Sequence, residues 1–346
     1  MNYSPLMRNL ERKDKVKIYS VGSFLPNQVV KSDDLFTEFS SEKNYDIPVD
    51  WMSDKMGICE RRMCDVDASP SSLAIPAAKK ALANFPSLNP DHIDLVSFCG
   101  IERDKSEPAT AHIIQHGLGL KAKMAFDMSN ACFGFIDGLN IAKNLIETGQ
   151  VRYALITTGE ITTKLTRYFV EELSKGIDRR VARDILGFLS VGDAGGAVVL
   201  GRSEDSSGFD AFEIRSDSSH NEKCYYEHDK DGGIKGQMKM AAIVKKTLDL
   251  QKTIFEPTLT RAGWAMPDYL LTHQVGRRAF EKVVELGVAP EKRMIKSYDV
   301  LGNITSATFA LNFDQLTQEM DMKENDKVYA CYSGSGVVVG QFAYTY

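Results

Sequence analysis

The chain has 346 residues, of which 43% are hydrophobic and 26% charged, and its formal net charge is −5. This length is sufficient for one large or two ordinary domains with a substantial core. The acidic balance and the lack of a sustained basic run argue against nucleic acid as a partner. No stretch of about eighteen apolar residues could span a bilayer, and residues 1–15 lack the apolar segment of a secretory signal. We therefore expect a cytoplasmic protein with neither a nucleic-acid nor a membrane partner.

The six cysteines are spread through the chain, at positions 59, 64, 99, 132, 224 and 331. Such spacing in a large chain is not that of a disulfide framework. Cys59 and Cys64 have four residues between them and no second pair nearby, so a metal site is not expected there. The sequence predicts a reduced protein that needs no metal and no bound cofactor.

Strand-like and helix-like segments alternate along the chain. Runs of apolar and β-branched residues predict strands over 16–22, 93–99, 124–128, 153–158 and 269–272. Helical spacing predicts helices over 76–83, 136–148 and 278–286, and a helix-rich stretch over 163–188. Such alternation indicates an α/β fold with largely buried sheets.

A short internal repeat predicts two related halves. The segments 192–201 and 333–340 each place a glycine-rich turn directly before a strand of valines. This similarity indicates a duplicated core with equivalent turns and strands. We expect an N-terminal extension over 1–14, a first half over 15–201 and a second half over 202–346. The polar stretch 202–236 is expected to form surface excursions between the halves.

Cys132 is the most informative residue of the chain. It stands between the predicted strand 124–128 and the predicted helix 136–148. Unpaired backbone N–H groups and the helix dipole at such a position favour a thiolate over a thiol. A thiolate is a nucleophile, so the site indicates covalent catalysis. An isolated cysteine is more often a small buried hydrophobe, and two distant residues decide against that alternative.

His273 and Asn303 are these two residues. His273 follows the predicted strand 269–272, and Asn303 lies between a strand-like segment and a helix. Both are positions at which α/β proteins place site residues, at the carboxyl ends of strands. Taken singly, they could be a structural histidine and a turn asparagine. Together with Cys132 they form a far more specific pattern.

With these motifs the sequence resembles the β-ketoacyl synthase III (KAS III) enzymes of the thiolase superfamily. The resemblance extends from Lys15 to the C-terminus. It rests on the segments 21–26, 51–62, 127–135, 192–201, 273–274 and 302–303. It implies a thiolase-like α/β fold, in which two βαβαβαββ halves form a five-layered αβαβα arrangement. It also implies a homodimer that uses acyl thioesters of coenzyme A or of an acyl carrier protein.

The resemblance assigns a role to each residue of this set. Cys132 would attack an acyl thioester and hold the acyl group covalently. The backbone N–H groups of Cys132 and Ser335 would form the oxyanion hole. His273 and Asn303 would donate hydrogen bonds to the carbonyl of a second thioester as it becomes an enolate. A Claisen condensation to a β-keto thioester would follow.

Glu107 distinguishes two kinds of KAS III enzyme. Those that use malonyl carrier protein need no carboxylate base, because loss of carbon dioxide generates the carbanion. A branch that joins two acyl chains carries a glutamate in a Glu-Pro-x-Thr-Ala segment similar to 107–111 here. It includes OleA-type enzymes and α-pyrone or dialkylresorcinol ketosynthases, in which this glutamate removes an α-proton in the partner subunit's site. Asn130 and Glu160 are also similar to that branch. The alternative for Glu107 is a solvated loop charge.

Four residues are candidates for binding the carrier. By resemblance Trp51 corresponds to a tryptophan that stacks on adenine, and Lys55 stands where an arginine is usual. Arg277 and Arg278 open a helix and could engage an acidic carrier protein, or they could form a solvated face. Gly276 stands where an asparagine that contacts pantetheine is usual, which argues against ordinary handling of coenzyme A.

The leading hypothesis is a ketosynthase for specialised lipid or polyketide biosynthesis. It would condense two acyl or β-ketoacyl thioesters through an acyl-Cys132 intermediate, with Glu107 as the α-proton base. One alternative is a decarboxylative KAS III enzyme that uses malonyl carrier protein. A second is an acyltransferase to a hydroxyl or an amine. A non-catalytic partner subunit is a third, but such subunits typically lose the nucleophile.

Overall fold

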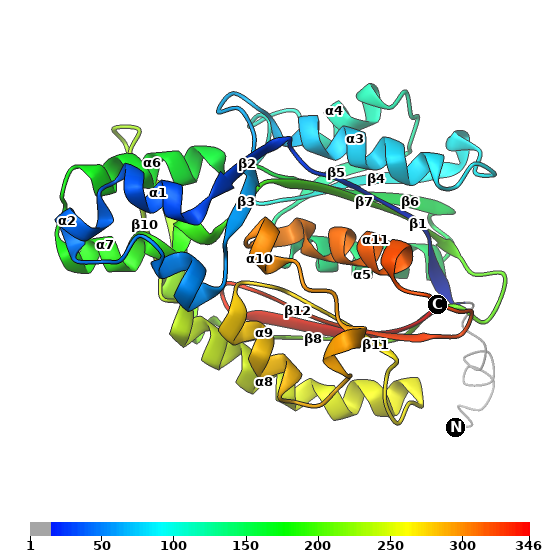
Figure 1. Cartoon of the computed structure of the whole chain (residues 1–346). Coiled ribbons are helices and arrows are strands. Elements are labelled where there is room, and N and C mark those ends of the chain that lie inside the picture. Colours follow the sequence, from blue (N-terminus) through cyan, green and yellow to red (C-terminus); the bar gives the residue numbers. More distant parts are fainter. Residues whose placement is uncertain (1–14) are drawn as a thin grey trace, which may run out of the picture.

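The computed structural model describes residues 15–346 and arranges them in five layers (Figure 1). Two sheets alternate with three layers of helices, which confirms the predicted thiolase-like α/β fold. The predicted extension over 1–14 lies outside the described residues. The principal helices are α3 (Pro70–Ala83) and α4 (Thr110–Gly117) on one outer face, α5 (Gly134–Glu147) and α11 (Thr308–Glu319) between the sheets, and α8 (Met240–Ala262) and α9 (Arg277–Val284) on the other outer face.

The first sheet has five strands in the order β1-β7-β6-β4-β5. Its central strands are buried on both faces, as expected of a sheet covered by helices on each side. The strands β6, β4 and β5 run parallel to one another, and β7 and β1 are antiparallel to their neighbours. The strands are β1 (Val16–Phe24), β4 (Ile93–Cys99), β5 (Met124–Met128), β6 (Tyr153–Glu160) and β7 (Ala194–Arg202).

The second sheet repeats this topology in the order β8-β13-β12-β11. Again two antiparallel pairings are followed by a parallel one. A single parallel bridge between Leu270 and Met294 occupies the place of a fifth strand. The second half therefore matches the first, except that a single bridge stands where the first sheet has its edge strand β5. The strands are β8 (Gly208–Ser216), β11 (Tyr269–Thr272), β12 (Lys327–Gly334) and β13 (Val338–Thr345).

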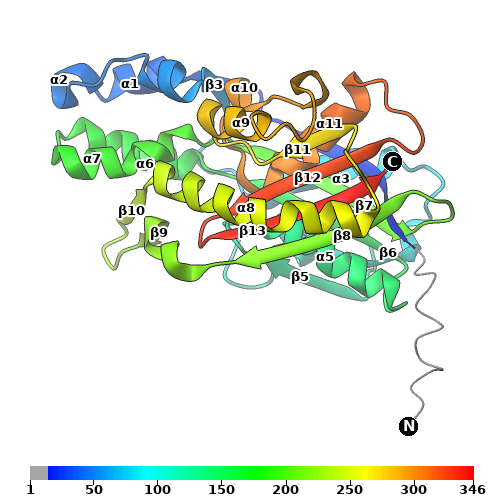
Figure 2. The same cartoon turned by 90° about the horizontal axis from the view of Figure 1, so that it is seen from below.

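Smaller elements extend beyond the layered core (Figure 2). One group is inserted between β1 and α3, a second between β6 and β7, a third between β8 and α8, and a short helix precedes α11. They are β2 (Gln28–Lys31), α1 (Ser32–Glu38), α2 (Ser41–Tyr45) and β3 (Glu60–Met63); α6 (Thr163–Ser174) and α7 (Arg179–Ile185); β9 (Cys224–His228) and β10 (Ile234–Met238); and α10 (Tyr298–Leu301).

The structure corrects the interpretation of the stretch 202–236. Instead of surface excursions alone, it contains β8, which forms one edge of the second sheet and buries Phe209 and Ala211. It also contains β9 and most of β10, which pair as a hairpin. The helix predicted from residue 76 begins earlier, at Pro70, and holds Pro76 inside it. Over residues 15–346, no helix is both long and apolar enough to cross a membrane.

Candidate active site

The carboxyl ends of parallel strands from both sheets bring the candidate residues together. Glu160 ends β6, Cys132 follows β5, His273 follows β11 and Ser335 follows β12. Because parallel strands end at the same edge of a sheet, side chains from distant parts of the sequence meet there. Asn303 joins them through a backbone bridge to Val191, just before β7.

The backbone before Cys132 forms a tight turn between β5 and α5. Ala131 has a φ of 47°, a left-handed conformation that non-glycine residues adopt infrequently. Its carbonyl accepts a hydrogen bond of 2.9 Å from the hydroxyl of Ser306, a residue of the second half. Phe133, on the other side of the cysteine, is fully buried. The turn is thus held from both halves, and it presents the thiol to a cavity.

The ionisation predicted for Cys132 is wrong for this structure. Burial raises the pKa of the thiol, with smaller contributions in the same direction from Cys224 and Glu160. Hydrogen bonds from the backbone and from Asn303 lower the pKa but do not compensate. Desolvation disfavours the charged form and outweighs the helix N-terminus. Cys132 is therefore a neutral thiol.

His273 is neutral for the same physical reason. Burial lowers the pKa of its imidazole to about 4, and its Nδ1 has no hydrogen-bond partner among the described residues. The side chain of the neighbouring Gln274 is fixed by three hydrogen bonds. Its amide nitrogen donates to the carbonyl of Ile295 (2.7 Å), and its oxygen accepts from the backbone N–H groups of Ser297 (2.8 Å) and Tyr298 (3.1 Å). This anchoring holds the loop after β11, so the imidazole faces the cavity as a neutral ring.

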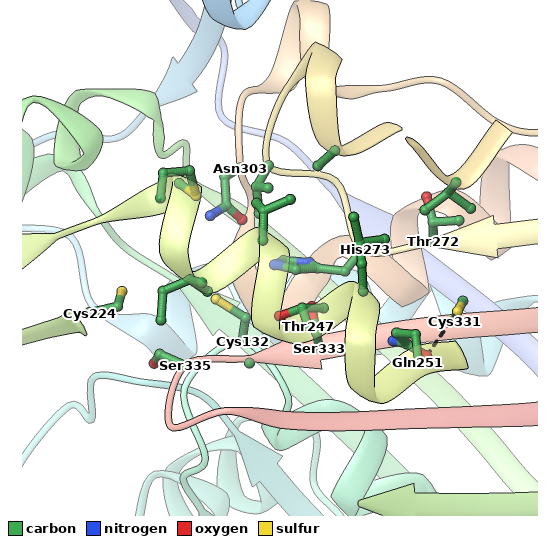
Figure 3. Close-up of a pocket in the computed structure, with 18 of the residues that line it drawn as sticks. Cys132, Cys224, Thr247, Gln251, Thr272, His273, Asn303, Cys331, Ser333 and Ser335 are labelled. Carbon is green, nitrogen blue, oxygen red and sulfur yellow. Dashed lines mark hydrogen bonds between the residues drawn. The ribbon is translucent and has the colours of Figure 1, made fainter. Parts of the chain in front are cut away.

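A hydrogen bond from Thr305 sets the orientation of the Asn303 side chain. Its Oδ1 accepts a 3.0 Å hydrogen bond from the backbone N–H of Thr305. The amide Nδ2 is therefore left to donate toward the cavity, and Figure 3 shows Asn303, His273 and Cys132 grouped around one space. Two neutral donors next to a thiol can stabilise an enolate oxygen without adding a charged group to the cavity.

Two cavities meet at Cys132. The smaller has a volume of about 100 Å³ and lies among the apolar side chains of α8 and α9, with His273 and Thr272 in its wall. The larger has a volume of about 530 Å³ and extends under the β9–β10 hairpin to α6, with Glu160 in its wall. The residues that line both are Cys132, Cys224, Met238, Asn303 and Ser335. A group held on the thiol can therefore reach either space.

Several lining residues were missed by the sequence analysis. Cys224 and Met238 come from the β9–β10 hairpin, in a polar stretch that gave no strand signal. Helix α8 was not predicted either, although its apolar positions facing the smaller cavity have helical spacing. These positions are Met240, Ile243, Val244 and Leu248, and the polar Thr247 and Gln251 line the same cavity. The spacing was the available signal for this helix.

Glu160 is a carboxylate in the wall of the larger cavity at Cys132, which the sequence analysis named only by resemblance. It is 1% exposed, and burial raises its pKa from 4.5 to about 7. The backbone after it is locked because the buried Asp193 accepts hydrogen bonds from the N–H and hydroxyl groups of Thr162 and Thr163. Glu160 is therefore a fixed, buried carboxyl group at the cavity.

Glu107 lies elsewhere in the single chain. It is exposed, in the loop between β4 and α4, and it lines neither cavity at Cys132. The loop is tied to β5, because the Asp127 carboxylate accepts hydrogen bonds from the backbone N–H groups of Thr110 (2.7 Å) and Ala111 (2.8 Å). β5 is an edge strand of the first sheet, and the helix α4 that follows the Glu107 loop is tied to it.

The predicted carrier-binding residues gather near the start of α9. The Trp51 ring packs on Phe36 with a centroid distance of 6.1 Å, and Lys55 is paired with Asp54 at 2.6 Å. Arg277 donates to the Asp54 carbonyl at 2.9 Å, whereas Arg278 is exposed. The same helix lines the smaller cavity with Ala279 and Val283.

The structure supplies a reason for Gly276. Its φ is +133°, and a Cβ at this position would lie 3.0 Å from the carbonyl oxygen of Met56. The start of α9 therefore approaches the 52–56 turn more closely than a side chain would allow.

Comparison with known proteins agrees with this geometry. Residues 126–218 match the 3-oxoacyl-[acyl-carrier-protein (ACP)] synthase III family, and residues 259–346 match its C-terminal domain. A β-ketoacyl-[acyl-carrier-protein] synthase III of Oceanobacillus iheyensis is 30% identical over 330 residues, covering 95% of this chain and 98% of that protein. The same enzyme of Listeria monocytogenes is 30% identical over 325 residues, covering 93% and 96%.

Solved structures of Xanthomonas campestris OleA are similar as well. The cerulenin-bound form is 25% identical, with a TM-score of 0.89 over 96% of this chain and 97% of that one. A point variant gives the same identity and score over 96% and 98%. The chain therefore belongs to the β-ketoacyl-[acyl-carrier-protein] synthase III family of acyl-transferring condensing enzymes, and its fold matches that of OleA.

Proposed function

We propose that this protein joins two acyl thioesters by a Claisen condensation that needs no decarboxylation. The observation that carries the proposal is the meeting of two cavities at one buried thiol, next to the donors His273 and Asn303. One cavity would hold the acyl chain bound to Cys132, and the other the chain that becomes the nucleophile. The likeness to OleA supports this assignment over a malonyl-dependent reaction.

In this reaction Cys132 is acylated first. The oxyanion of the tetrahedral intermediate is held by the backbone N–H groups of Cys132 and Ser335. The second thioester then loses an α-proton to Glu107. Its enolate oxygen is stabilised by His273 and Asn303, and its α-carbon attacks the acyl-Cys132 carbonyl. Collapse of the tetrahedral intermediate releases the Cys132 thiolate, which recovers the proton from Glu107. The product is a 2-alkyl-3-keto thioester for specialised lipid or polyketide biosynthesis.

Glu107 reaches the thiol only if a second copy of the chain brings it there. The edge strand β5 is apolar and half-exposed along its length, with Met124, Phe126 and Met128. Pairing β5 with its counterpart would bury this edge and place each Glu107 loop against the other subunit. Acyl groups would be delivered by coenzyme A or an acyl carrier protein, with Trp51, Lys55, Arg277 and Arg278 as the contact surface.

Product analysis and intact-protein mass spectrometry together test the function. Wild-type protein is given a medium-chain acyl thioester, with and without malonyl carrier protein. We expect an acyl adduct on Cys132 and condensed product without malonyl thioester. Glu107→Ala should keep the adduct and lose the product, whereas Lys105→Ala, a change in the same exposed loop, should keep both.

Two outcomes would contradict the proposal. Product that strictly requires malonyl thioester and is indifferent to Glu107→Ala would indicate a decarboxylative enzyme. An adduct on Cys132 that passes to a hydroxyl or an amine, without a new carbon–carbon bond, would indicate an acyltransferase.

A further inference from the structure

Glu160 is a buried carboxyl group in the wall of the larger cavity at Cys132. Hydrogen bonds from the hydroxyl groups of Thr305 and Ser306 and from the Ser306 backbone favour its charged form, but burial outweighs them. Its Oε2 accepts a long bond, 3.5 Å, from the backbone N–H of Ile101. Acidic side chains this deeply buried are normally paired with a cation, because a buried charge without one costs free energy. None of the described cations forms an ion pair with Glu160. An exception at the wall of a cavity that holds a nucleophile indicates a function.

Titratable groups from every element around the cavity face Glu160. From the loop after β4 come Glu102 and Arg103, from α6 comes Lys164, and from the hairpin come Tyr226 and His228. The Tyr226 hydroxyl donates to the Glu102 carboxylate, so that acid is already paired. Arg103, Lys164 and His228 are exposed at the rim. Apart from the thiols Cys99, Cys132 and Cys224, the neighbours of Glu160 are thus either paired or at the solvent.

Acylation of Cys132 requires a proton acceptor. The thiol is neutral, because burial raises its pKa. His273 is a weak base, since burial lowers its pKa to about 4. Glu160 lines the same cavity as the thiol, and its charge is one cause of the raised Cys132 pKa. Its own pKa, raised to about 7 by burial, suits a group that must accept and return a proton near neutral pH.

We propose that Glu160 carries the proton of the Cys132 thiol to the leaving thiol during acyl loading. The carboxylate accepts the proton from Sγ as the bond from Sγ to the acyl carbon forms and the carbonyl electrons move to oxygen. When that oxyanion collapses, the bond from carbon to the carrier's sulfur breaks, and Glu160 returns the proton to this sulfur. The proton and the electrons balance, and Glu160 ends as the carboxylate it was at the start.

This assignment rests on the proposed function only in that Cys132 must accept an acyl group from a thioester. Glu160 would act in the same chain as its thiol and at the loading step. Glu107 would act from the partner subunit and at the later condensation step. The two carboxylates can therefore be tested separately.

The test is the rate of acylation of Cys132 as a function of pH, by rapid quench and intact-protein mass spectrometry with medium-chain acyl-coenzyme A. The Glu107→Ala background prevents condensation from consuming the adduct. We expect loading to rise about tenfold per pH unit up to pH ~7 and then to level off. Glu160→Gln should slow loading roughly 100-fold and remove this inflection. Glu102→Gln, a matched change on the same cavity wall, should retain the inflection.

A second substrate separates proton transfer from a structural role. A thioester of an acidic aryl thiol departs without needing protonation, so Glu160→Gln should impair its loading less than that of acyl-coenzyme A. A Glu160→Gln defect of equal size at every pH and with both thioesters would overturn the proposal. A loading profile without an inflection near neutrality in the protein that retains Glu160 would also overturn it, even if Glu160→Gln did not fold. Failure of the proposed condensation would show in the products and leave the loading profile unchanged.

Discussion

Burial sets the charge of the Cys132 thiol and of two titratable side chains near it, Glu160 and His273. It raises the pKa of Cys132 above its ordinary value, raises that of Glu160 to about 7, and lowers that of His273 to about 4. Each shift disfavours the charged form, as desolvation requires. The positioned donors His273 and Asn303 can then stabilise the charge that develops during the reaction.

The buried Glu160 carboxyl should cost the protein stability as pH rises. Its pKa is above the ordinary value of 4.5 in the folded state, so the folded state holds this proton more tightly than the unfolded state does. The free energy of unfolding should therefore fall between about pH 4.5 and pH 7, by up to about 3 kcal/mol. Glu160→Gln removes this loss. Urea unfolding should show the variant more stable than wild type at about pH 8 and not at about pH 4.5.

Asn303→Asp tests the donor role of the amide. An aspartate retains the oxygen that accepts from the Thr305 N–H, but it replaces the donor Nδ2 with a second acceptor. It should lower the condensation rate roughly 100- to 1,000-fold and slow acyl loading much less. The two rates are separated by comparing product formation with the amount of Cys132 adduct. Equal loss of both rates would mean that Asn303 positions the nucleophile instead.

At the scale of elements, the link between β5 and α4 should position Glu107. The Asp127 carboxylate binds the first two N–H groups of α4, directly after the Glu107 loop. Asp127→Ala should cost about 1–2 kcal/mol of stability, as for a lost helix cap, and lower condensation roughly 10- to 100-fold through misplacement of the base.

A matched variant distinguishes position from stability. Asp178→Ala removes the N-cap carboxylate of α7, which accepts hydrogen bonds from the backbone N–H groups of Arg180 and Val181, at a helix that does not follow the Glu107 loop. It should cost similar stability, measured by thermal unfolding, and leave the ratio of condensation to loading unchanged. If both variants lower this ratio equally, Asp127 does not act through Glu107.

The sequence predicted elements well where apolar patterning alone determines them. Strands β4 and β5 have the predicted bounds, because their runs are apolar and end at turn residues. The start of α3 was misjudged because Pro76 resembles a first-turn proline, whereas Pro70 holds that position. The β9–β10 hairpin was missed because it is a polar two-stranded element, fixed by its contact with the core and not by its own pattern.

For the molecule as a whole, motifs identified the family and the set of candidate residues, but not their environment. The thiolate at Cys132 was predicted from a helix N-terminus, a local feature, whereas its pKa depends on burial by segments more than ninety residues away, such as Cys224 and Met238. The burial of Glu160 likewise depends on tertiary structure. Two cavities converging on one thiol could not be read from spacing, because α8, α9, α6 and the hairpin form them jointly.

The position of Glu107 on an exposed loop makes the proposed dimer testable by complementation. Cys132→Ala and Glu107→Ala should each be inactive in condensation. After the two are mixed and subunits exchange, each heterodimer holds one site with a thiol from one copy and a glutamate from the other. Random exchange should then restore about a quarter of wild-type activity. Glu107→Ala mixed with the Cys132→Ala/Glu107→Ala double variant has no glutamate and should stay inactive. No recovery in the first mixture, with exchange verified by native mass spectrometry, would place the base within the same chain.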